Sequence, residues 1–313
     1  MQVITVSKFG DPGVLEVGEA PMPQPGPGEV LVRVLAAGVG PWDATLRRGA
    51  YTGSLPYVPG GEFAGEVVGD TGADASFDDG APVYGYPGLT GCYAQYLTCP
   101  VEQLAPIPAE LSAADAAAVP IDALTAHQGL TDVLGVGPGH QVLITAGAGG
   151  VGHFAVQIGR ILGAEVVATA SPQNHEFLHH LGATVVIDHT KPDWPDQVRD
   201  VTNGGAERVL ATAAPTLEGA ARAARDGGLV ATPVHADAPA GNRIRWQQYN
   251  GDASGTRLIR MAPWFDDESL TVSVQERFYW QDAARAHEVV ERGHTQGKIV
   301  LIVDDDLATA LEV

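Results

Sequence analysis

A glycine-rich segment is the clearest candidate for chemistry in the sequence. Residues 147–152 read Gly-Ala-Gly-Gly-Val-Gly, which fits G-x-G-x-x-G, and they lie between a short apolar run over 141–145 and an amphipathic run over 152–162. In this pattern the first glycine permits a tight turn, the second lets a diphosphate approach the backbone, and the third lets the helix pack on the strand. Free N–H groups at the helix N-terminus then face the phosphates. The segment predicts dinucleotide binding by Gly147, Ala148, Gly149, Gly150, Val151 and Gly152; the alternative is a strand–helix turn without a ligand.

The residues after the next strand bear on which dinucleotide binds. NAD sites usually place an Asp or Glu about 20 residues beyond the glycines, but the strand expected over 165–170 ends at Ala170 and Ser171 without an acid. The missing carboxylate favours NADPH, although no Lys or Arg follows directly to meet a 2′-phosphate. Ser171, Asn174 and His189 could hydrogen-bond that phosphate, or these polar residues could only cap helices. NADPH is therefore the expected coenzyme, and NADH is not excluded.

A second motif suggests a different chemistry. His175-Glu-Phe-Leu-His179 fits H-E-x-x-H, in which two histidines on one helix face bind zinc and the glutamate acts as the base. The longer form of this signature needs a histidine at position 185, which is Val185. The motif also follows directly on the second strand of the predicted nucleotide unit. We therefore expect an ordinary helix here, and a zinc metallohydrolase is the competing class of protein.

The order of predicted elements indicates two kinds of domain. Short β-rich runs separated by Gly and Pro are typical of an antiparallel module, and they cover residues 2–8, 30–36, 62–68, 81–86 and 92–98. Beyond Ser112, a predicted helix N-cap, the chain continues as a helical run that Pro120 is expected to break. Strands and helices then alternate up to a last strand at 243–249, which predicts a parallel sheet with helices on both faces.

The C-terminal part is expected to rejoin the first module, with strands at 269–274 and 298–303 and a helix at 281–292. The predicted fold class is thus α/β, with a doubly wound Rossmann domain inserted into a β-rich domain. The inserted domain would span 121–261, and the β-rich domain would consist of 1–120 and 262–313.

Composition narrows the possible partners. With 18 basic and 38 acidic residues the net charge is −20, which repels nucleic-acid phosphates and anionic membranes, so neither partner is expected. Two cysteines, Cys92 and Cys99, cannot form a disulfide framework or a four-cysteine zinc lobe. The sequence shows no leader pattern and no long apolar run. A cytoplasmic location is therefore expected.

These motifs together resemble the medium-chain dehydrogenase/reductase superfamily, and within it the zinc-free, zeta-crystallin-like quinone oxidoreductases. The resemblance covers nearly the whole chain and is carried by residues 60–69, 124–126, 142–152, 177–183 and 293–301. It implies a Rossmann domain inserted into a GroES-like substrate domain, with the active site in the cleft between them. It also implies a homodimer that pairs through the last strand of the Rossmann sheet.

Departures from the zinc-dependent relatives restrict the chemistry. Those relatives carry a cysteine near position 40 and a histidine in Gly-His-Glu, whereas this chain has Gly40 and the triplet Gly60-Gly61-Glu62. Because catalytic zinc needs three protein ligands, no metal is expected. Hydride transfer without a metal requires a small-molecule acceptor that activates itself, such as a quinone or an α,β-unsaturated carbonyl. A non-catalytic, crystallin-like NADPH-binding protein remains an alternative.

The resemblance also implies roles for individual residues. Tyr51 would donate a hydrogen bond to the substrate oxygen or only pack, and Asp43 would contact the substrate or cap the following helix. Trp42 would stack on the substrate or fill the core. Thr125 would lie near the phosphate or ribose on the nicotinamide side of the coenzyme. Lys298 would reach the coenzyme and substrate cleft or lie on a surface strand.

Overall fold

The fold is seen in a computed structural model that describes residues 1–69, 77–239 and 243–313. The chain divides into two compact units. Unit 1 comprises Met1–Ile121 and Ala253–Val313, and unit 2 comprises Asp122–Asp252. From the sequence we expect the chain to return to the first domain at residue 262, whereas in the structure unit 1 resumes at Ala253. The difference arises because helix α8 (Gly255–Asp266) packs on strand β7 (Leu104–Pro106) of unit 1.

Unit 1 is organised around the long strand β3 (Glu29–Val39), whose side chains alternate between buried and half-buried. Strand β15 (Lys298–Ile302) pairs antiparallel with β3, and β14 (Val274–Tyr279) pairs parallel with β15. The sheet runs in the order β14-β15-β3-β4-β5-β7, and β6 also pairs with β3. The C-terminal strands therefore do rejoin the N-terminal module, as expected.

The remaining strands of unit 1 are β4 (Phe63–Val68), β5 (Pro82–Gly85), β6 (Tyr96–Pro100) and the antiparallel pair β1 (Gln2–Val6) and β2 (Leu15–Glu19). Its other helices are α1 (Pro41–Thr45), α2 (Ala113–Ala116), α9 (Ala283–Arg292) and α10 (Asp305–Ala310). The predicted N-cap at Ser112 is confirmed, since its side chain accepts the N–H of Asp115 at 3.1 Å. Helix α9 contributes apolar side chains to the same core as the sheet.

Unit 2 contains a six-stranded sheet in the order β10-β9-β8-β11-β12-β13, and every pair in it is parallel. The strands are β8 (Gln141–Thr145), β9 (Glu165–Ala170), β10 (Val185–Asp188), β11 (Ala206–Ala211), β12 (Ala224–Thr232) and β13 (Arg245–Gln248). This is the doubly wound α/β arrangement expected from the alternating elements.

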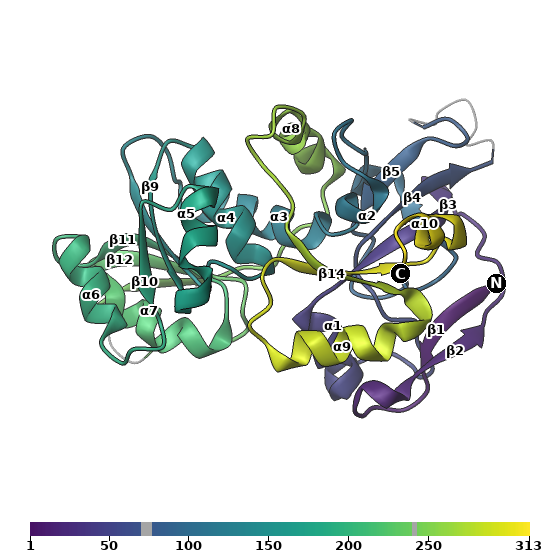
Figure 1. Cartoon of the computed structure of the whole chain (residues 1–313), viewed down its shortest axis with the longest axis horizontal. Coiled ribbons are helices and arrows are strands. Elements are labelled where there is room, and N and C mark those ends of the chain that lie inside the picture. The colour runs from purple at the N-terminus through teal and green to yellow at the C-terminus, as the bar shows by residue number, and fades with distance from the viewer. Residues whose placement is uncertain (70–76, 240–242) are drawn as a thin grey trace. The chain divides into compact units, whose positions relative to one another are not determined.

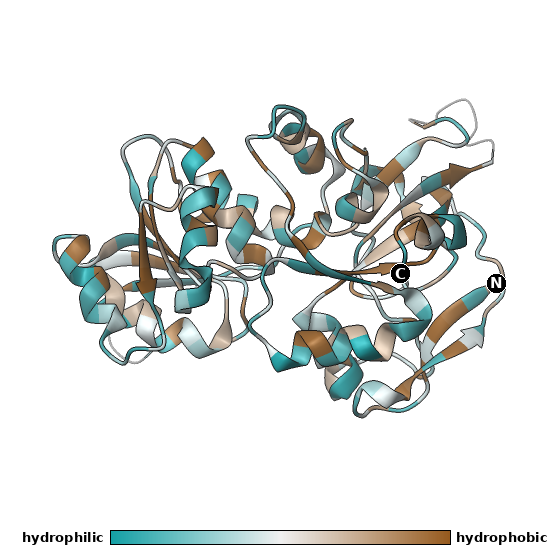
Figure 2. Cartoon of the chain, viewed as in Figure 1, coloured by the Kyte–Doolittle hydropathy of each residue, from teal (hydrophilic) through white to brown (hydrophobic). Residues whose placement is uncertain are grey.

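Helices cover both faces of the parallel sheet (Figure 1). Helix α4 (Gly150–Ile161) packs with α5 (His175–Leu181), and α6 (Trp194–Val201) packs with α7 (Leu217–Ala223). In Figure 2 the strands of this sheet are coloured mostly as hydrophobic, while the helices mix apolar and hydrophilic residues. Burial on both faces explains the apolar sequences of the central strands β8 and β9, in which four of five and five of six residues are buried.

Three segments differ from the sequence-based expectations. The helical run expected before Pro120 ends earlier, at Ala116, and Pro120 starts a further helix, α3 (Pro120–Gln128), because a proline without an N–H suits the first helical turn. Helix α8 was not expected. Residues 269–273 are not a strand, because the N–H of Leu270 bonds the carbonyl of Trp264 and closes the end of α8.

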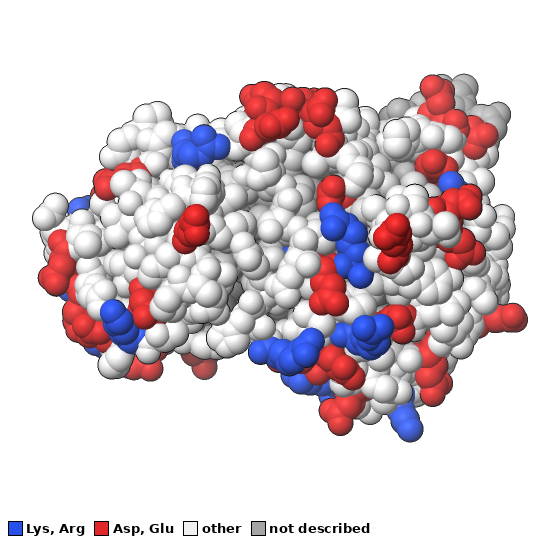
Figure 3. Space-filling view, in the orientation of Figure 1, with Lys and Arg blue, Asp and Glu red and all other residues white. Residues whose placement is uncertain are grey.

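The surface reflects the acidic composition. Three consecutive exposed acids, Asp266, Asp267 and Glu268, lie at the end of α8, and Figure 3 shows acidic side chains gathered over that helix. Among the helices that the structure describes, none combines the length and the apolar character needed to cross a bilayer.

Candidate functional site

The glycine-rich turn joins the end of β8 to the start of α4. Ala146 has a positive φ of 50°, and Gly149 is the N-cap of α4. The N–H of Gly147 donates to the carbonyl of Thr169 at 2.8 Å, and the N–H of Ala146 donates to the Thr169 hydroxyl at 3.3 Å. Thr169 on β9 is fully buried and thus holds the turn. The sequence analysis missed it, because a single Thr in a strand carries no signal of this contact.

The glycines of the turn are required for different reasons. A Cβ at Gly152 would lie 2.2 Å from the carbonyl oxygen of Ala146, and one at Gly147 would lie 3.0 Å from Leu178. Packing against the backbone therefore demands glycine at position 152, whereas a Cβ at Gly147 would only crowd the side chains of Leu178 and Ala168. A Cβ at Gly149 would meet only Ala146 O at 3.5 Å, an ordinary contact. Packing within the protein therefore does not account for Gly149, whereas a bound diphosphate, which needs close approach to the backbone, would.

The polar residues predicted for the adenosine end lie together at the carboxyl ends of β9 and β10. Asn174 and Ser171 are buried, and the Asn174 amide donates to the Ser171 hydroxyl at 3.4 Å. The N–H of His189 donates to the carbonyl of Ala170 at 3.3 Å. Neither Ser171 nor Asn174 caps a helix with its side chain. Capping alone therefore does not account for these residues.

Thr125 lies on helix α3 and is also buried. Its carbonyl accepts the hydroxyl of Tyr249 at 2.9 Å, and a Cβ at Gly251 would lie 2.6 Å from its hydroxyl oxygen. These contacts fix the Thr125 backbone within unit 2. Its expected role beside the nicotinamide half of the coenzyme stays a prediction.

The H-E-x-x-H segment forms helix α5, and its histidines bond to the backbone. His175 Nε2 donates to the carbonyl of Ala170 at 3.3 Å, and His179 Nδ1 donates to the carbonyl of Ala183 at 3.0 Å. Over residues 1–69, 77–239 and 243–313, no group of three His, Cys, Asp or Glu side chains is placed to hold a metal ion. His175 and His179 thus have structural roles as donors to backbone carbonyls.

In unit 1, Asp43 is buried in the first turn of α1. Its carboxylate accepts the N–H of Gly40 at 2.8 Å and a second backbone N–H from Gly60. The Asp43 side chain therefore caps its own helix rather than a following one. The bond to Gly60 also ties α1 to the Gly60-Gly61-Glu62 triplet.

Lys298 and Glu62 form a buried ion pair. Their Nζ and Oε1 atoms are 2.6 Å apart, and the side chains are 3% and 2% exposed. Glu62 Oε2 also accepts the N–H of Ile121 at 2.8 Å. Lys298 is therefore not a surface residue. The sequence analysis missed Glu62 as a functional candidate because it considered this triplet only for its missing histidine.

The ion pair affects the ionisation of Asp43. Burial raises the pKa of Asp43 from its usual 3.8 to about 7, opposed by the N–H donated from Gly40. The charge of Glu62 raises this pKa further, while that of Lys298 lowers it. Lys298 is bonded to Glu62, and Asp43 forms no ion pair with any residue that the structure describes. Asp43 therefore exchanges a proton close to neutral pH.

Two tyrosines lie beside this cluster. Tyr51 is half-buried, and its ring stacks on that of Tyr57 with centroids 4.1 Å apart and an interplanar angle of 25°. Tyr57 was not selected from the sequence, in which it reads as one more aromatic near a turn. Trp42, next to Asp43, is 39% exposed, so it does not fill the core.

Position 61 has no room for a metal ligand. A Cβ at Gly61 would lie 2.8 Å from the Ile121 side chain and 3.1 Å from the carbonyl of Gly88. A histidine at this position, where zinc-dependent relatives carry one, would therefore require its neighbours to shift.

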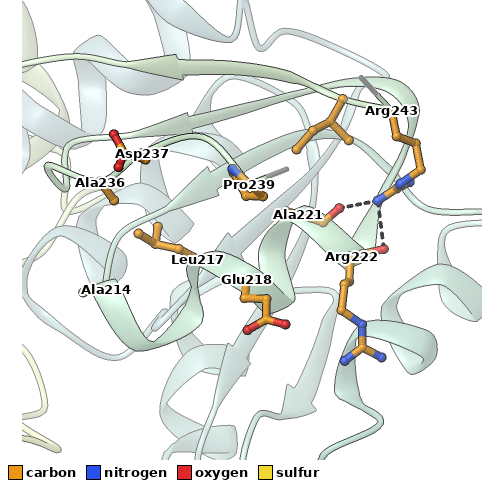
Figure 4. Close-up of a pocket in the computed structure, with 10 residues that line it drawn as sticks. Ala214, Leu217, Glu218, Ala221, Arg222, Ala236, Asp237, Pro239 and Arg243 are labelled. Carbon is orange, nitrogen blue, oxygen red and sulfur yellow. Dashed lines mark hydrogen bonds between the residues drawn. The ribbon is translucent and has the colours of Figure 1, made fainter. Parts of the chain in front are cut away.

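A separate groove of about 640 Å³ runs between α7 and the segment before β13 (Figure 4). Leu217 and Pro239 line it, and Arg243 donates to the carbonyls of Ala221 and Arg222 at the end of α7. Since that guanidinium is engaged by the helix end and none of the predicted site residues lines the groove, we assign no function to it.

Comparison with known proteins supports the family resemblance that the sequence motifs indicated. Residues 26–109 match the alcohol dehydrogenase GroES-like domain, and residues 181–301 match the family described as zinc-binding dehydrogenase. A probable quinone oxidoreductase of Schizosaccharomyces pombe is 30% identical over 98% of this chain and 99% of its own length. A trans-enoyl reductase of Aspergillus terreus is 29% identical over 90% of this chain and 88% of its own.

Solved structures of similar proteins support the same family. A mycobacterial protein in complex with NADPH superposes with a TM-score of 0.86 and 30% identity, covering 97% of this chain and 100% of its own. The chain therefore belongs to the medium-chain dehydrogenase/reductase superfamily, in its quinone oxidoreductase branch.

The two glycine variants G149A and G152A should separate ligand binding from packing. Because nothing in the protein crowds Gly149, the free energy of unfolding of G149A should lie within about 1 kcal/mol of the wild-type value. NADPH binding should weaken by about tenfold or more, since the added methyl group would lie where the diphosphate binds. G152A should instead destabilise the protein by about 1–3 kcal/mol. Urea unfolding and NADPH fluorescence titration measure the two effects. Equal NADPH affinity of G149A and wild type would contradict this assignment.

The variant D43N should change how stability depends on pH. Because the pKa of Asp43 is raised from 3.8 to about 7, the folded state keeps a proton that the unfolded state releases in this window. Wild type should therefore lose stability as pH rises from about 4 to about 7, at roughly 1.4 kcal/mol per unit of pKa difference. D43N should lack this part of the slope in urea unfolding at a series of pH values. Identical slopes for the two proteins would show that Asp43 is not the group responsible.

Proposed function

We propose that this chain is an NADPH-dependent oxidoreductase that reduces quinones or α,β-unsaturated carbonyls by hydride transfer without a metal. The observation that carries this proposal is the uncrowded backbone at Gly149, in a turn where packing against the Ala146 carbonyl requires glycine at position 152. The family membership and the acceptors named for the relatives support the same reaction class.

Unit 2 would be the coenzyme-binding domain. The N–H groups of Gly150 and Val151, in the first turn of α4, would hold the diphosphate. Ser171, Asn174 and His189 would meet the 2′-phosphate at the ends of β9 and β10 without an opposing carboxylate on β9. NADPH would supply the hydride when bound. NADH lacks the phosphate that these residues would contact and should bind more weakly.

Unit 1 would be the substrate domain. Gly40 and Gly61 stand where zinc-dependent relatives carry ligands, and neither can coordinate a metal. The acceptor must then stabilise the incoming charge through its own conjugated carbonyl. The half-buried Tyr51 would donate a hydrogen bond to the acceptor oxygen, and the partly exposed Trp42 would stack on the acceptor.

We also propose a cytoplasmic homodimer with no nucleic-acid or membrane partner. In the described part of the chain β13 pairs only with β12, so its outer edge is open for a second copy. The net charge of −20 disfavours binding to phosphate backbones and anionic lipid.

The direct test is NADPH oxidation, followed by absorbance, with a panel of quinones and enones and with NADH in parallel. We expect turnover of at least one acceptor, a preference for NADPH, and no loss of activity after treatment with a metal chelator. A protein that binds NADPH but oxidises it with no acceptor would be a non-catalytic binding protein. Chelator-sensitive activity would contradict the metal-free mechanism.

A further inference from the structure

One side chain of helix α4 bonds back to the glycine turn that precedes it. The Nδ1 atom of His153 lies 2.6 Å from the carbonyl oxygen of Gly150 and 3.1 Å from that of Gly149. A carbonyl can only accept, so Nδ1 carries the hydrogen and donates to both. The backbone N–H of His153 already donates to the Gly149 carbonyl at 2.9 Å, as the helix requires. The imidazole is therefore an additional constraint on the carbonyls of Gly149 and Gly150.

These two carbonyls belong to the peptide units that carry the proposed diphosphate donors. The carbonyl of Gly149 shares its peptide unit with the N–H of Gly150, and the carbonyl of Gly150 shares its unit with the N–H of Val151. A peptide unit is planar and trans, so its N–H points opposite to its C=O. A donor that fixes both carbonyls therefore also fixes the direction of both N–H groups, which point out of the N-terminal end of α4.

The imidazole of His153 is itself held in place. His153 is fully buried, and its ring packs against that of Phe154 with centroids 4.0 Å apart. A ring packed in this way has little freedom to leave the two carbonyls. A hydrogen bond accepted by a carbonyl also polarises its peptide unit and strengthens the N–H donor of the same unit. His153 thus acts on both the direction and the strength of the N–H groups of Gly150 and Val151.

We propose that His153 is a positioning residue for coenzyme binding, which holds the carbonyls of the glycine turn so that the N–H groups of Gly150 and Val151 face the diphosphate. This inference rests on the proposed function, because the diphosphate is that of the bound coenzyme. His153 acts through the backbone and exchanges no proton or electron during the reaction. Since NADPH and NADH share the diphosphate, His153 contributes equally to the binding of both.

The same helix offers a matched control one turn later. Gln157 is 3% exposed, and its side-chain amide donates to the carbonyl of His153 at 3.0 Å. It therefore also bonds from a buried position to a carbonyl four residues earlier. That carbonyl shares its peptide unit with the N–H of Phe154, which lies beyond the first turn and has its partner within the helix. Gln157 thus makes the same kind of bond without acting on the proposed diphosphate donors.

Three variants separate the bond to the turn from the packing of α4. H153L removes the Nδ1 donor, H153N returns a side-chain N–H that can bond to a preceding carbonyl, and Q157L removes the control bond. We expect H153L to raise the Kd values of NADPH and NADH by about three- to tenfold, the range for one hydrogen bond. The ratio of the two Kd values should stay at the wild-type value. H153N should recover most of the affinity, and Q157L should keep both wild-type Kd values.

Fluorescence titration with each reduced coenzyme measures the Kd values, and thermal unfolding of each variant measures the effect on stability. With an acceptor that the wild type reduces, H153L should show a raised KM for NADPH and an unchanged kcat, because a positioning residue for the diphosphate affects coenzyme binding and not the hydride step.

Four results would overturn the proposal. Wild-type Kd values in H153L would show that the bonds to the turn do not affect coenzyme binding. Equal losses of affinity in H153L and Q157L, or no recovery in H153N, would assign the effect to the packing of α4. A changed ratio of the NADPH and NADH Kd values in H153L would place the effect at the 2′-phosphate instead of the diphosphate. A wild-type protein that binds neither coenzyme would refute the proposed function itself, before any variant is compared.

Discussion

The buried ion pair between Lys298 and Glu62 is the constraint on which unit 1 depends. It joins the C-terminal strand β15 to the Gly60-Gly61-Glu62 triplet, and Glu62 also holds the N–H of Ile121, the last residue before the chain enters unit 2. Losing one partner would leave a buried charge uncompensated, at a cost of about 3–5 kcal/mol. Asp43 is buried near this pair, and burial is the main cause of its raised pKa, which the charge of Glu62 raises further and that of Lys298 lowers. The Lys298–Glu62 ion pair thus affects the charges on the proposed acceptor side and also stabilises unit 1.

In unit 2 the turn between β8 and α4 is shaped by steric constraints rather than by an ion pair. The carbonyl of Ala146 leaves no room for a side chain at Gly152, so α4 can start close to the end of β8 and direct its N–H groups outward. Thr169 fixes the same turn from the neighbouring strand through two hydrogen bonds. Packing thus fixes the turn at Gly152 and leaves Gly149 uncrowded. A turn of this kind is suited to hold a charged ligand without rearranging.

Much of this could be predicted from the sequence, because the signals were local. The alternation of strands and helices predicted the inserted parallel sheet, and the spacing of the glycines predicted the nucleotide turn. Helix α3 was missed because Pro120 was taken to break a helix rather than to start one. The pairing of Glu62 with Lys298 and the stacking of Tyr57 on Tyr51 depend on tertiary contacts. Residues so far apart in sequence as 62 and 298 give no periodic signal, and so these parts of the site became visible only in the structure.

The proposed reaction is the passage of a hydride from bound NADPH to a conjugated acceptor. Its most direct test is to supply NADPH carrying deuterium at C4 of the nicotinamide, on the transferred face, together with an enone, and to locate the label in the product by mass spectrometry and NMR. The account predicts deuterium on the electrophilic carbon and solvent hydrogen at the position that is protonated. Product without deuterium at that carbon, or with solvent hydrogen there, would contradict it.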